Sequence, residues 1–270
     1  MNIVIIGTGY VGLVTGVGLA SLGNFVNFID LDENKIEDLS SKKITFYEPG
    51  LEEYFNDDAT FKRMSFSSDY ASIEWDNIDI VFVCVQTPNN IETNSVDTKF
   101  LESAIKEINN VNNNDLVITV KSTIPPYEIE KVCEKVGMDS SKLTFNPEFL
   151  REGTAVEDFF KPDRIVLGGT DSEKLTKLKE LYSGFDCEII TTDSISSQLI
   201  KYLANTYLPL RLSFVNEATR LIDYSGGNLD DVLKGVGLDN RIGQHYFRPS
   251  PSWGGSCFPK DLVEVNNFYD

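Results

Sequence analysis

Short apolar runs alternate with helix-type periodicity along the first two-thirds of the chain. The apolar runs predict strands at residues 2–6, 25–29, 80–85, 116–120, 143–145, 164–167 and 188–190. Helical patterns lie between them, near residues 11–22, 98–109, 127–136 and 172–182. Strands that alternate with helices in this way are typical of a parallel sheet covered by helices. We therefore expect an α/β fold for this part of the chain.

The pattern changes near Asp193, where a long helix is predicted to begin and to run to about Tyr224. Pro209 lies inside this helix, and we expect it to kink the helix or to break its hydrogen-bond ladder locally. A shorter helix over residues 229–236 and a loop-rich segment over residues 239–259 follow.

This change of pattern predicts two domains. Residues 1–192 would form the sheet-containing domain, and residues 193–270 a small all-helical domain that opens with the long helix. A length of 270 residues agrees with one large domain and a smaller one.

A glycine motif, Gly7-Thr8-Gly9-Tyr10-Val11-Gly12, follows the first predicted strand and opens the first helix. This is the G-x-G-x-x-G pattern of dinucleotide sites, in which Gly7 permits a tight turn and Gly12 permits close packing of helix and strand. Gly9 lets the pyrophosphate approach the backbone, where the N–H groups at Tyr10 and Val11 begin the helix. The alternative is a tight strand–helix turn that binds nothing.

An acidic residue ends the second predicted strand, as a dinucleotide site requires. Asp30 would accept hydrogen bonds from the adenosine ribose and would repel a 2′-phosphate, which favours NAD over NADP. Lys35 is expected near the same ribose or phosphate. With strand, helix and acid in agreement, we predict a Rossmann-like doubly wound sheet that binds NAD.

Polar residues follow two further strands, where doubly wound sheets place their ligand-facing loops. Thr123 either holds a water or contacts the nicotinamide, or it caps the next helix, and the residues alone do not decide between these roles. Thr87 and Pro88 are expected to line the cofactor cleft. In the segment 146–153, two glutamates flank an arginine, which suits the orientation of water and substrate or, more simply, a solvated loop with a surface ion pair.

Three features of the C-terminal third are candidates for chemistry. Lys201 and Asn205 are four residues apart on one helix face, where they either stabilise an oxyanion or form solvated surface. Cys257 lies three residues before a lysine, and its thiolate would form a covalent thioester during an oxidation. Arg241 is a fork-shaped donor suited to a phosphate.

The charge balance, 24 basic against 42 acidic residues for a net charge of −18, argues against nucleic acid or anionic membrane as a partner. We find no signal peptide and no apolar run of membrane-spanning length. The four cysteines are widely spaced, so neither a disulfide framework nor a metal site is predicted. A cytoplasmic location is the simplest expectation.

These segments, taken in order, resemble the UDP-glucose/GDP-mannose dehydrogenase family over nearly the whole chain, and its UDP-glucose branch in particular. The resemblance implies an NAD-dependent four-electron oxidation of UDP-glucose to UDP-glucuronate, as used in polysaccharide biosynthesis. It implies the following catalytic residues: Cys257, Lys201, Asn205, Thr123, Asp261, Glu148 and Glu152. It adds Glu152 and Lys260 to the cofactor site, and it implies a substrate site of Glu148, Phe149, Leu150, Arg151, Lys201, Asn205, Arg241, Tyr246 and Gly254.

The resemblance also implies a homodimer formed through the long helix. Because members of the family continue into a further domain that grips UDP, we expect this chain to be a fragment with impaired turnover. Alternatives are a dehydrogenase for GDP-mannose or a UDP-N-acetylhexosamine, a 3-hydroxyacid dehydrogenase, and a non-catalytic NAD-binding dimerisation module. The Cys257 segment argues against the 3-hydroxyacid enzyme.

Overall fold

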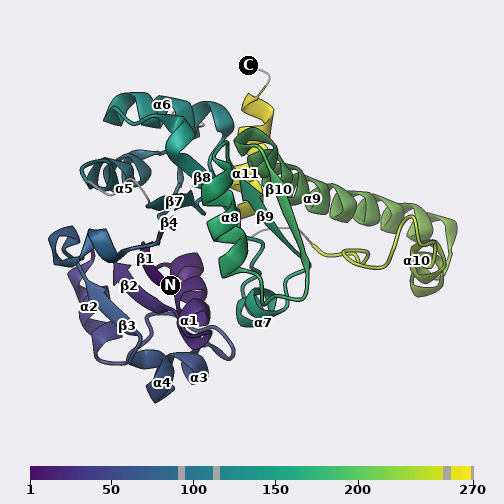
Figure 1. The fold of residues 1–270 in the computed structure, drawn as a ribbon. Coiled ribbons are helices and arrows are strands. Elements are labelled where there is room, and N and C mark those ends of the chain that lie inside the picture. Colours follow the sequence, from purple (N-terminus) through teal and green to yellow (C-terminus); the bar gives the residue numbers. More distant parts are fainter. Residues whose placement is uncertain (91–94, 112–115, 252–256, 269–270) are drawn as a thin grey trace. The chain divides into compact units, whose positions relative to one another are not determined.

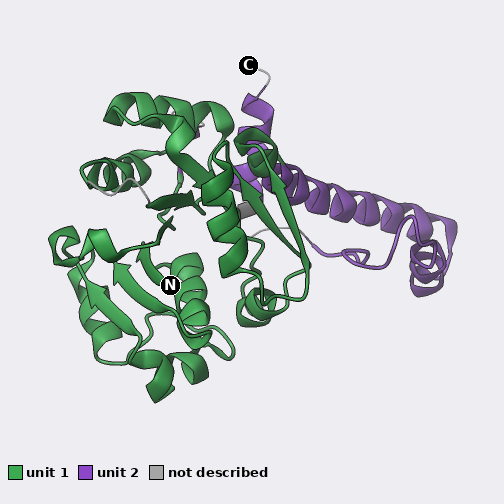
Figure 2. Cartoon of the chain, viewed as in Figure 1, with its two compact units in different colours: residues 1–88, 97–199 green, residues 89–96, 200–270 purple. Residues whose placement is uncertain are grey.

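A computed structural model describes residues 1–90, 95–111, 116–251 and 257–268 (Figure 1). The described chain divides into two compact units, residues 1–88 with 97–199 and residues 89–96 with 200–270 (Figure 2). The predicted domain boundary after residue 192 stays a prediction. No helix in the described part of the chain is both long enough and apolar enough to cross a membrane.

An eight-stranded sheet forms the centre of the first unit, counted over the described residues. Its order is β10-β9-β8-β7-β4-β1-β2-β3. The strands are β1 (Asn2–Ile6), β2 (Phe25–Ile29), β3 (Met64–Ser67), β4 (Ile80–Val83), β7 (Val117–Val120), β8 (Leu143–Phe145), β9 (Arg164–Gly168) and β10 (Glu188–Thr192). The strands from β3 to β8 run parallel, and β10 is parallel to β9. The α/β Rossmann-like prediction is therefore confirmed, with the addition that β9 pairs antiparallel to β8.

Helices cover both faces of this sheet because successive side chains of each strand point to opposite sides. In β1, Ile3 and Ile5 join one core and Val4 and Ile6 join the other. The first core contains residues of α1 (Tyr10–Ser21), α3 (Leu51–Asn56), α7 (Ala155–Phe160) and α8 (Ser172–Leu181). The second contains residues of α5 (Lys99–Asn109) and α6 (Pro126–Val136). This arrangement is the doubly wound architecture.

The segment between β2 and β4 holds elements that the hydrophobic pattern did not predict. They are α2 (Glu33–Ser40), α3, α4 (Asp58–Phe61), β3 and the 3₁₀ turns Tyr70–Ser72 and Trp75–Asn77. A further 3₁₀ turn, Ser140–Lys142, precedes β8. In α2 only Leu39 is buried, and in β3 only Met64. Elements this short, with two buried side chains at most, give too weak a periodicity to be recognised.

In its described residues, the regular elements of the second unit are helices and the two-residue strands β5 (Asn89–Asn90) and β6 (Ser95–Val96). Its helices are α9 (Ser194–Ser225), whose first residues belong to the first unit, α10 (Leu229–Gly237) and α11 (Cys257–Asn267). The predicted long helix is confirmed. α9 continues through Pro209, where the proline supplies no N–H to the ladder and the remaining turns hold the helix together. The kink or local break predicted there stays a prediction.

Candidate functional site

The loops that carry predicted site residues gather at one edge of the sheet. They follow β1, β4, β7 and β8, which are parallel and share the carboxyl edge of the sheet. The strand order reverses direction at β1, between β2 and β4, which is the point where doubly wound sheets bind their ligands.

The glycine turn after β1 has no room for side chains at two of its positions. Gly7 has a φ of +96°, and a Cβ on it would lie 2.7 Å from the carbonyl oxygen of Cys84. A Cβ on Gly12 would lie 1.9 Å from the carbonyl oxygen of Gly7. The turn therefore requires glycine at both positions, as the motif predicted.

The position between them has a different surrounding. Gly9 is the N-cap of α1 with a φ of −70°, and a Cβ there would meet nothing within 4 Å. Open space beside the first turn of a helix leaves the N–H groups at Tyr10 and Val11 accessible to an anion, and the helix dipole favours negative charge there.

The acid at the end of β2 is fixed by the same turn. Asp30 accepts hydrogen bonds from the backbone N–H of Thr8 at 2.8 Å and from its hydroxyl at 2.7 Å, and Lys35 Nζ lies 3.9 Å away. Burial opposes ionisation of Asp30, but the bonds from Thr8 and Asp32 and the charge of Lys35 lower its pKa below the usual range. The carboxylate is ionised at neutral pH and keeps further lone pairs for ribose hydroxyls.

Thr87 joins two of the loops at this edge, since its hydroxyl donates to the carbonyl oxygen of Thr123 at 2.9 Å. Thr87 is buried and Thr123 is half-buried. The residue at the N-cap of α6 is Pro125, and no side chain caps that helix. The capping role that Thr123 offered from sequence is therefore wrong, which leaves its contact with water or cofactor as the open role. Pro88 ends the stretch of the first unit that continues from β4.

Asn146, at the end of β8, is the buried centre of a polar network. Its side-chain oxygen accepts hydrogen bonds from Lys121 Nζ at 2.9 Å and from the Tyr182 hydroxyl at 2.7 Å. Its amide nitrogen donates to the carbonyl oxygen of Val166 at 2.9 Å. This network fixes where the following loop leaves the sheet.

The loop over residues 146–153 (the site loop) carries five predicted site residues. Glu148 accepts a hydrogen bond from the backbone N–H of Leu150 at 2.7 Å, and the Arg164 guanidinium lies 3.6 Å from the centre of the Phe149 ring. Leu150 packs against the first core, so the loop is anchored from within.

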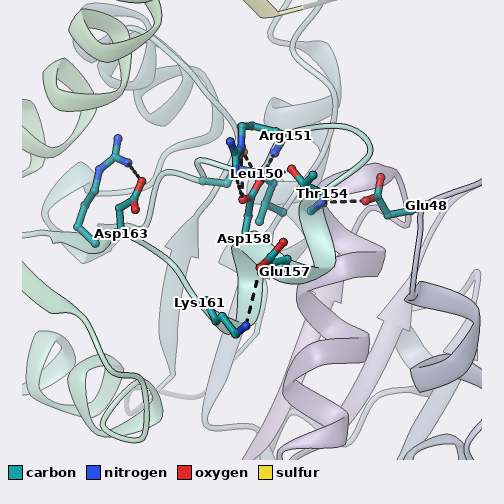
Figure 3. Close-up of polar contacts among 11 residues, drawn as sticks. Glu48, Leu150, Arg151, Thr154, Glu157, Asp158, Lys161 and Asp163 are labelled. Carbon is teal, nitrogen blue, oxygen red and sulfur yellow. Dashed lines mark hydrogen bonds and ion pairs between the residues drawn. The ribbon is translucent and has the colours of Figure 1, made fainter. Parts of the chain in front are cut away.

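Arg151 contacts Asp158 of α7, a partner seven residues further along the chain. Figure 3 shows the two side chains pointing toward one another, with Arg151 Nε 3.0 Å from Asp158 Oδ2. The backbone N–H of Arg151 donates to the same oxygen at 2.9 Å. The surface ion pair that the residues suggested therefore exists with a partner that was not predicted, while Glu152 is exposed.

Glu48 is a buried acid of this region that the sequence analysis did not identify. It is 4% exposed, and its Oε2 accepts hydrogen bonds from the Tyr10 hydroxyl at 3.0 Å and from Gly153 N at 2.8 Å. Its Oε1 accepts from Ala155 N, the first residue of α7, at 2.8 Å, and Figure 3 shows it facing this helix start. Its place in Tyr47-Glu48-Pro49-Gly50, outside any predicted element, gave no signal.

In the second unit, the predicted helix pair belongs to a buried cluster. Lys201 is 4% exposed and Asn205 7% exposed, so the solvated-surface alternative is wrong for both. Asn205 Nδ2 donates to Asp261 Oδ2 at 2.6 Å, and Lys260 Nζ lies 2.8 Å from Asp261 Oδ1. Asp261 is fully buried, so an amide and an ammonium group stabilise its charge where water does not reach.

Cys257 is the first residue of α11, four residues or about one helical turn before Asp261. The predicted loop-rich segment, residues 239–259, therefore extends three residues too far, because α11 begins at Cys257. Among the remaining predictions, Gly254 lies outside the described residues.

Of the predicted substrate residues between α10 and α11, the two that the structure describes are at the surface. Arg241 is exposed and is held by Asp239, with Nη2 2.6 Å from Oδ2. Tyr246 is exposed and has a φ of +56°. Arg211 of α9 supports this segment by donating to the carbonyl oxygens of Ile242 at 2.8 Å and Gly243 at 3.0 Å.

The fold and the glycine turn define a dinucleotide-binding protein, and comparisons identify its family. Residues 1–186 match the NAD-binding domain of the UDP-glucose/GDP-mannose dehydrogenase family, and residues 195–269 match its central domain. The chain belongs to this family. The prediction of NAD as cofactor is confirmed by the family's domain, and the open space at Gly9 and the ionised Asp30 fit that cofactor.

Individual relatives agree with this assignment. A UDP-glucose 6-dehydrogenase of Rickettsia felis is 40% identical over 275 residues, covering 100% of this chain and 61% of the relative. The structure of a UDP-glucose dehydrogenase from Pyrobaculum islandicum has a TM-score of 0.89 and 36% identity, covering 99% of this chain and 63% of that one. A GDP-mannose dehydrogenase from Pseudomonas aeruginosa has a TM-score of 0.82 and 28% identity, with 99% and 64% covered. The chain thus spans less than two-thirds of each.

Two alanine substitutions separate the roles of the glycines. Gly9→Ala should lower the melting temperature only by the small cost of alanine at an N-cap, because its Cβ meets no atom within 4 Å. It should weaken NAD binding by about tenfold or more, because the methyl group stands where the pyrophosphate approaches. Gly12→Ala should lower the melting temperature, because its Cβ would overlap the Gly7 carbonyl. Calorimetric titration with NAD and thermal melting measure both effects. Equal loss of stability in the two variants would contradict this division.

Proposed function

We propose that the protein oxidises the C6 hydroxyl of UDP-glucose to a carboxylate in two NAD-dependent steps. The observation that carries this proposal is the buried contact between Asn205 and Asp261, which places an amide donor and a carboxylate together one helical turn after Cys257. The names of the relatives, UDP-glucose 6-dehydrogenases, support the choice of substrate. When bound, NAD accepts a hydride from C6 in each step.

In the first oxidation, the chain must remove a proton from the C6 hydroxyl and stabilise the developing alkoxide. We propose that a water held by Asp261 accepts this proton, and the predicted part of Thr123 in holding that water stays a prediction. An amide nitrogen carries two N–H groups, so Asn205 can hold Asp261 and also donate to the substrate oxygen. The Lys201 ammonium, on the same helix face, would supply the positive charge for that oxygen.

In the second oxidation, the Cys257 thiolate adds to the aldehyde carbon, and a sulfur–carbon bond forms while the carbonyl oxygen becomes an alkoxide. Loss of a hydride from this thiohemiacetal gives a thioester. Water then breaks the sulfur–carbon bond, releases the acid and regenerates the thiol, with Glu148 or Glu152 assisting. Reactive cysteines are often found at helix N-termini because the unpaired N–H groups stabilise a thiolate. Cys257 occupies such a position in α11.

The remaining predicted residues would bind the substrate. The site-loop residues Phe149, Leu150 and Arg151 stay predicted substrate contacts, as do Arg241, Tyr246 and Gly254 of the second unit. Arg241 is paired with Asp239 at the surface. Exposed pairs of this kind contribute little to stability, so the guanidinium can exchange its partner for a diphosphate at small cost. A cytoplasmic location and a role in polysaccharide biosynthesis stay predictions.

We also propose a homodimer, which an exposed apolar stripe on α9 supports. Six large side chains of this helix are between 55% and 90% exposed: Leu203, Tyr207, Leu210, Phe214, Leu221 and Tyr224. Their spacing alternates between three and four residues, with Glu217 at the one position that breaks the stripe. This is the spacing of helices that pack against a partner helix, and a second copy of the chain offers the same stripe.

The dimer is tested by a charge placed in the middle of the stripe. Leu210→Glu should convert a dimer into a monomer, because it would bury an unpaired carboxylate between two apolar surfaces. Leu22→Glu is the matched control, since Leu22 is 52% exposed and belongs to the first unit. Sedimentation equilibrium measures the mass. A wild-type protein that sediments as a single chain would contradict the proposal.

The covalent step is tested at its nucleophile. Cys257→Ala should reduce formation of the acid by at least about a thousandfold, because the aldehyde would lose its only thiolate acceptor in the proposed scheme. Cys187→Ala, at a half-buried free cysteine of the first unit, is the matched control and should retain turnover. Chromatography of UDP-glucose and UDP-glucuronate gives the rate. Unchanged acid formation by Cys257→Ala would rule out the thioester.

A further inference from the structure

Glu48 contacts two parts of the first unit that carry different predicted roles. Glu48 accepts a hydrogen bond from the hydroxyl of Tyr10, which is the first residue of α1. It also accepts one from the backbone N–H of Gly153, the last residue of the site loop. Ala155, the third donor, begins α7. The same carboxylate therefore bonds both to the first residue of the helix after the glycine turn and to the segment that carries Glu148 and Glu152.

The position of Glu48 is itself fixed from several sides. Its carbonyl oxygen accepts a hydrogen bond from Leu51 N at 3.1 Å, at the start of α3. The Phe46 ring, two residues earlier, lies 5.6 Å from the Tyr10 ring. A side chain held in this way transmits a displacement of one of its partners to the others, because it has no room to adjust alone.

The hydrogen bonds themselves are strong ones. A buried carboxylate loses its hydration, and charge-assisted bonds from several donors compensate for that loss. Burial, and then the bond to Glu48, raise the pKa of Tyr10 above its usual range, and the charges of Glu152 and Asp158 act in the same direction. Tyr10 therefore stays protonated and remains a donor to Glu48 over the working pH range.

The loop side of this contact has no side-chain cap of its own. Thr154 is the N-cap of α7 and makes no side-chain cap bond, while its hydroxyl donates to Asp158 at 3.2 Å. Glu48, which is 107 residues from Ala155 in the sequence, accepts the hydrogen bond from the Ala155 N–H in place of a cap. An acid near a helix N-terminus also interacts favourably with the helix dipole.

We propose that Glu48 is a positioning residue that couples the dinucleotide turn to the site loop. Anything that orders Tyr10 at the start of α1 then also orders residues 146–153, and ordering of the loop strengthens binding at the turn, because coupling between two sites is reciprocal. The inference rests on the proposed function only in assigning NAD to the turn and catalytic glutamates to the loop.

Hydrogen exchange tests the coupling without turnover. Tyr10→Phe removes a donor on the α1 side and leaves the ring and every atom of the loop in place. Glu48→Gln keeps the size of the side chain and removes its charge. Glu52→Gln, at an exposed acid of α3, is the matched control. Exchange is measured for the backbone amides of residues 148–156 and, as an internal reference, for those of β4 and β7, with and without NAD.

Without NAD, Tyr10→Phe and Glu48→Gln should speed exchange of the loop amides by about tenfold, the loss expected for a hydrogen bond to a charged group, and Glu52→Gln should not. With NAD, exchange in the loop should slow in the wild type and not in Glu48→Gln. Unchanged loop exchange in Tyr10→Phe, or an equal increase in β4 and β7, would overturn the coupling. If calorimetry shows that the wild type does not bind NAD, the proposed cofactor role fails, and the comparison without NAD alone decides the coupling.

Discussion

The hydrogen bonds of Asn146 are the interaction on which the arrangement of the first unit depends. One buried amide joins Lys121 at the end of β7, the main chain of β9 and the Tyr182 hydroxyl. Lys121 is 6% exposed, and its charge would be costly without this acceptor. Asn146 is also the first residue of the site loop. The hydrogen bond that it accepts from the buried Lys121 ammonium therefore also fixes where the loop begins. Glu48 then holds the other end of the loop at Gly153.

The two units hold different kinds of polar groups, and the groups of the second unit are more deeply buried. The first unit holds a glycine turn and an ionised acid, which suit a cofactor that binds and leaves. The second unit holds Asn205 and Asp261 in a buried contact, where charges act strongly because water is excluded. Charged groups buried at this depth are expensive for folding, and a catalytic role of the kind proposed gives a reason to retain them.

Sequence reasoning succeeded where function imposes a local pattern. The spacing of Gly7, Gly9 and Gly12 after a strand predicted the turn, and the four-residue spacing of Lys201 and Asn205 predicted their common face. It failed where contacts join distant segments. The partners of Glu48 are 38, 105 and 107 residues away, so no window along the chain could reveal them. Asp158, the partner of Arg151, was missed because the loop folds back on a helix that was itself not predicted.

A four-electron oxidation of a nucleotide sugar yields a fixed ratio of products, which can be measured. With limiting UDP-glucose and excess NAD, absorbance gives the NADH formed and chromatography gives the sugar consumed. We expect two NADH for each UDP-glucose, with UDP-glucuronate as the product. A ratio of one, with the aldehyde as the product, or oxidation of another nucleotide sugar in place of UDP-glucose, would contradict it.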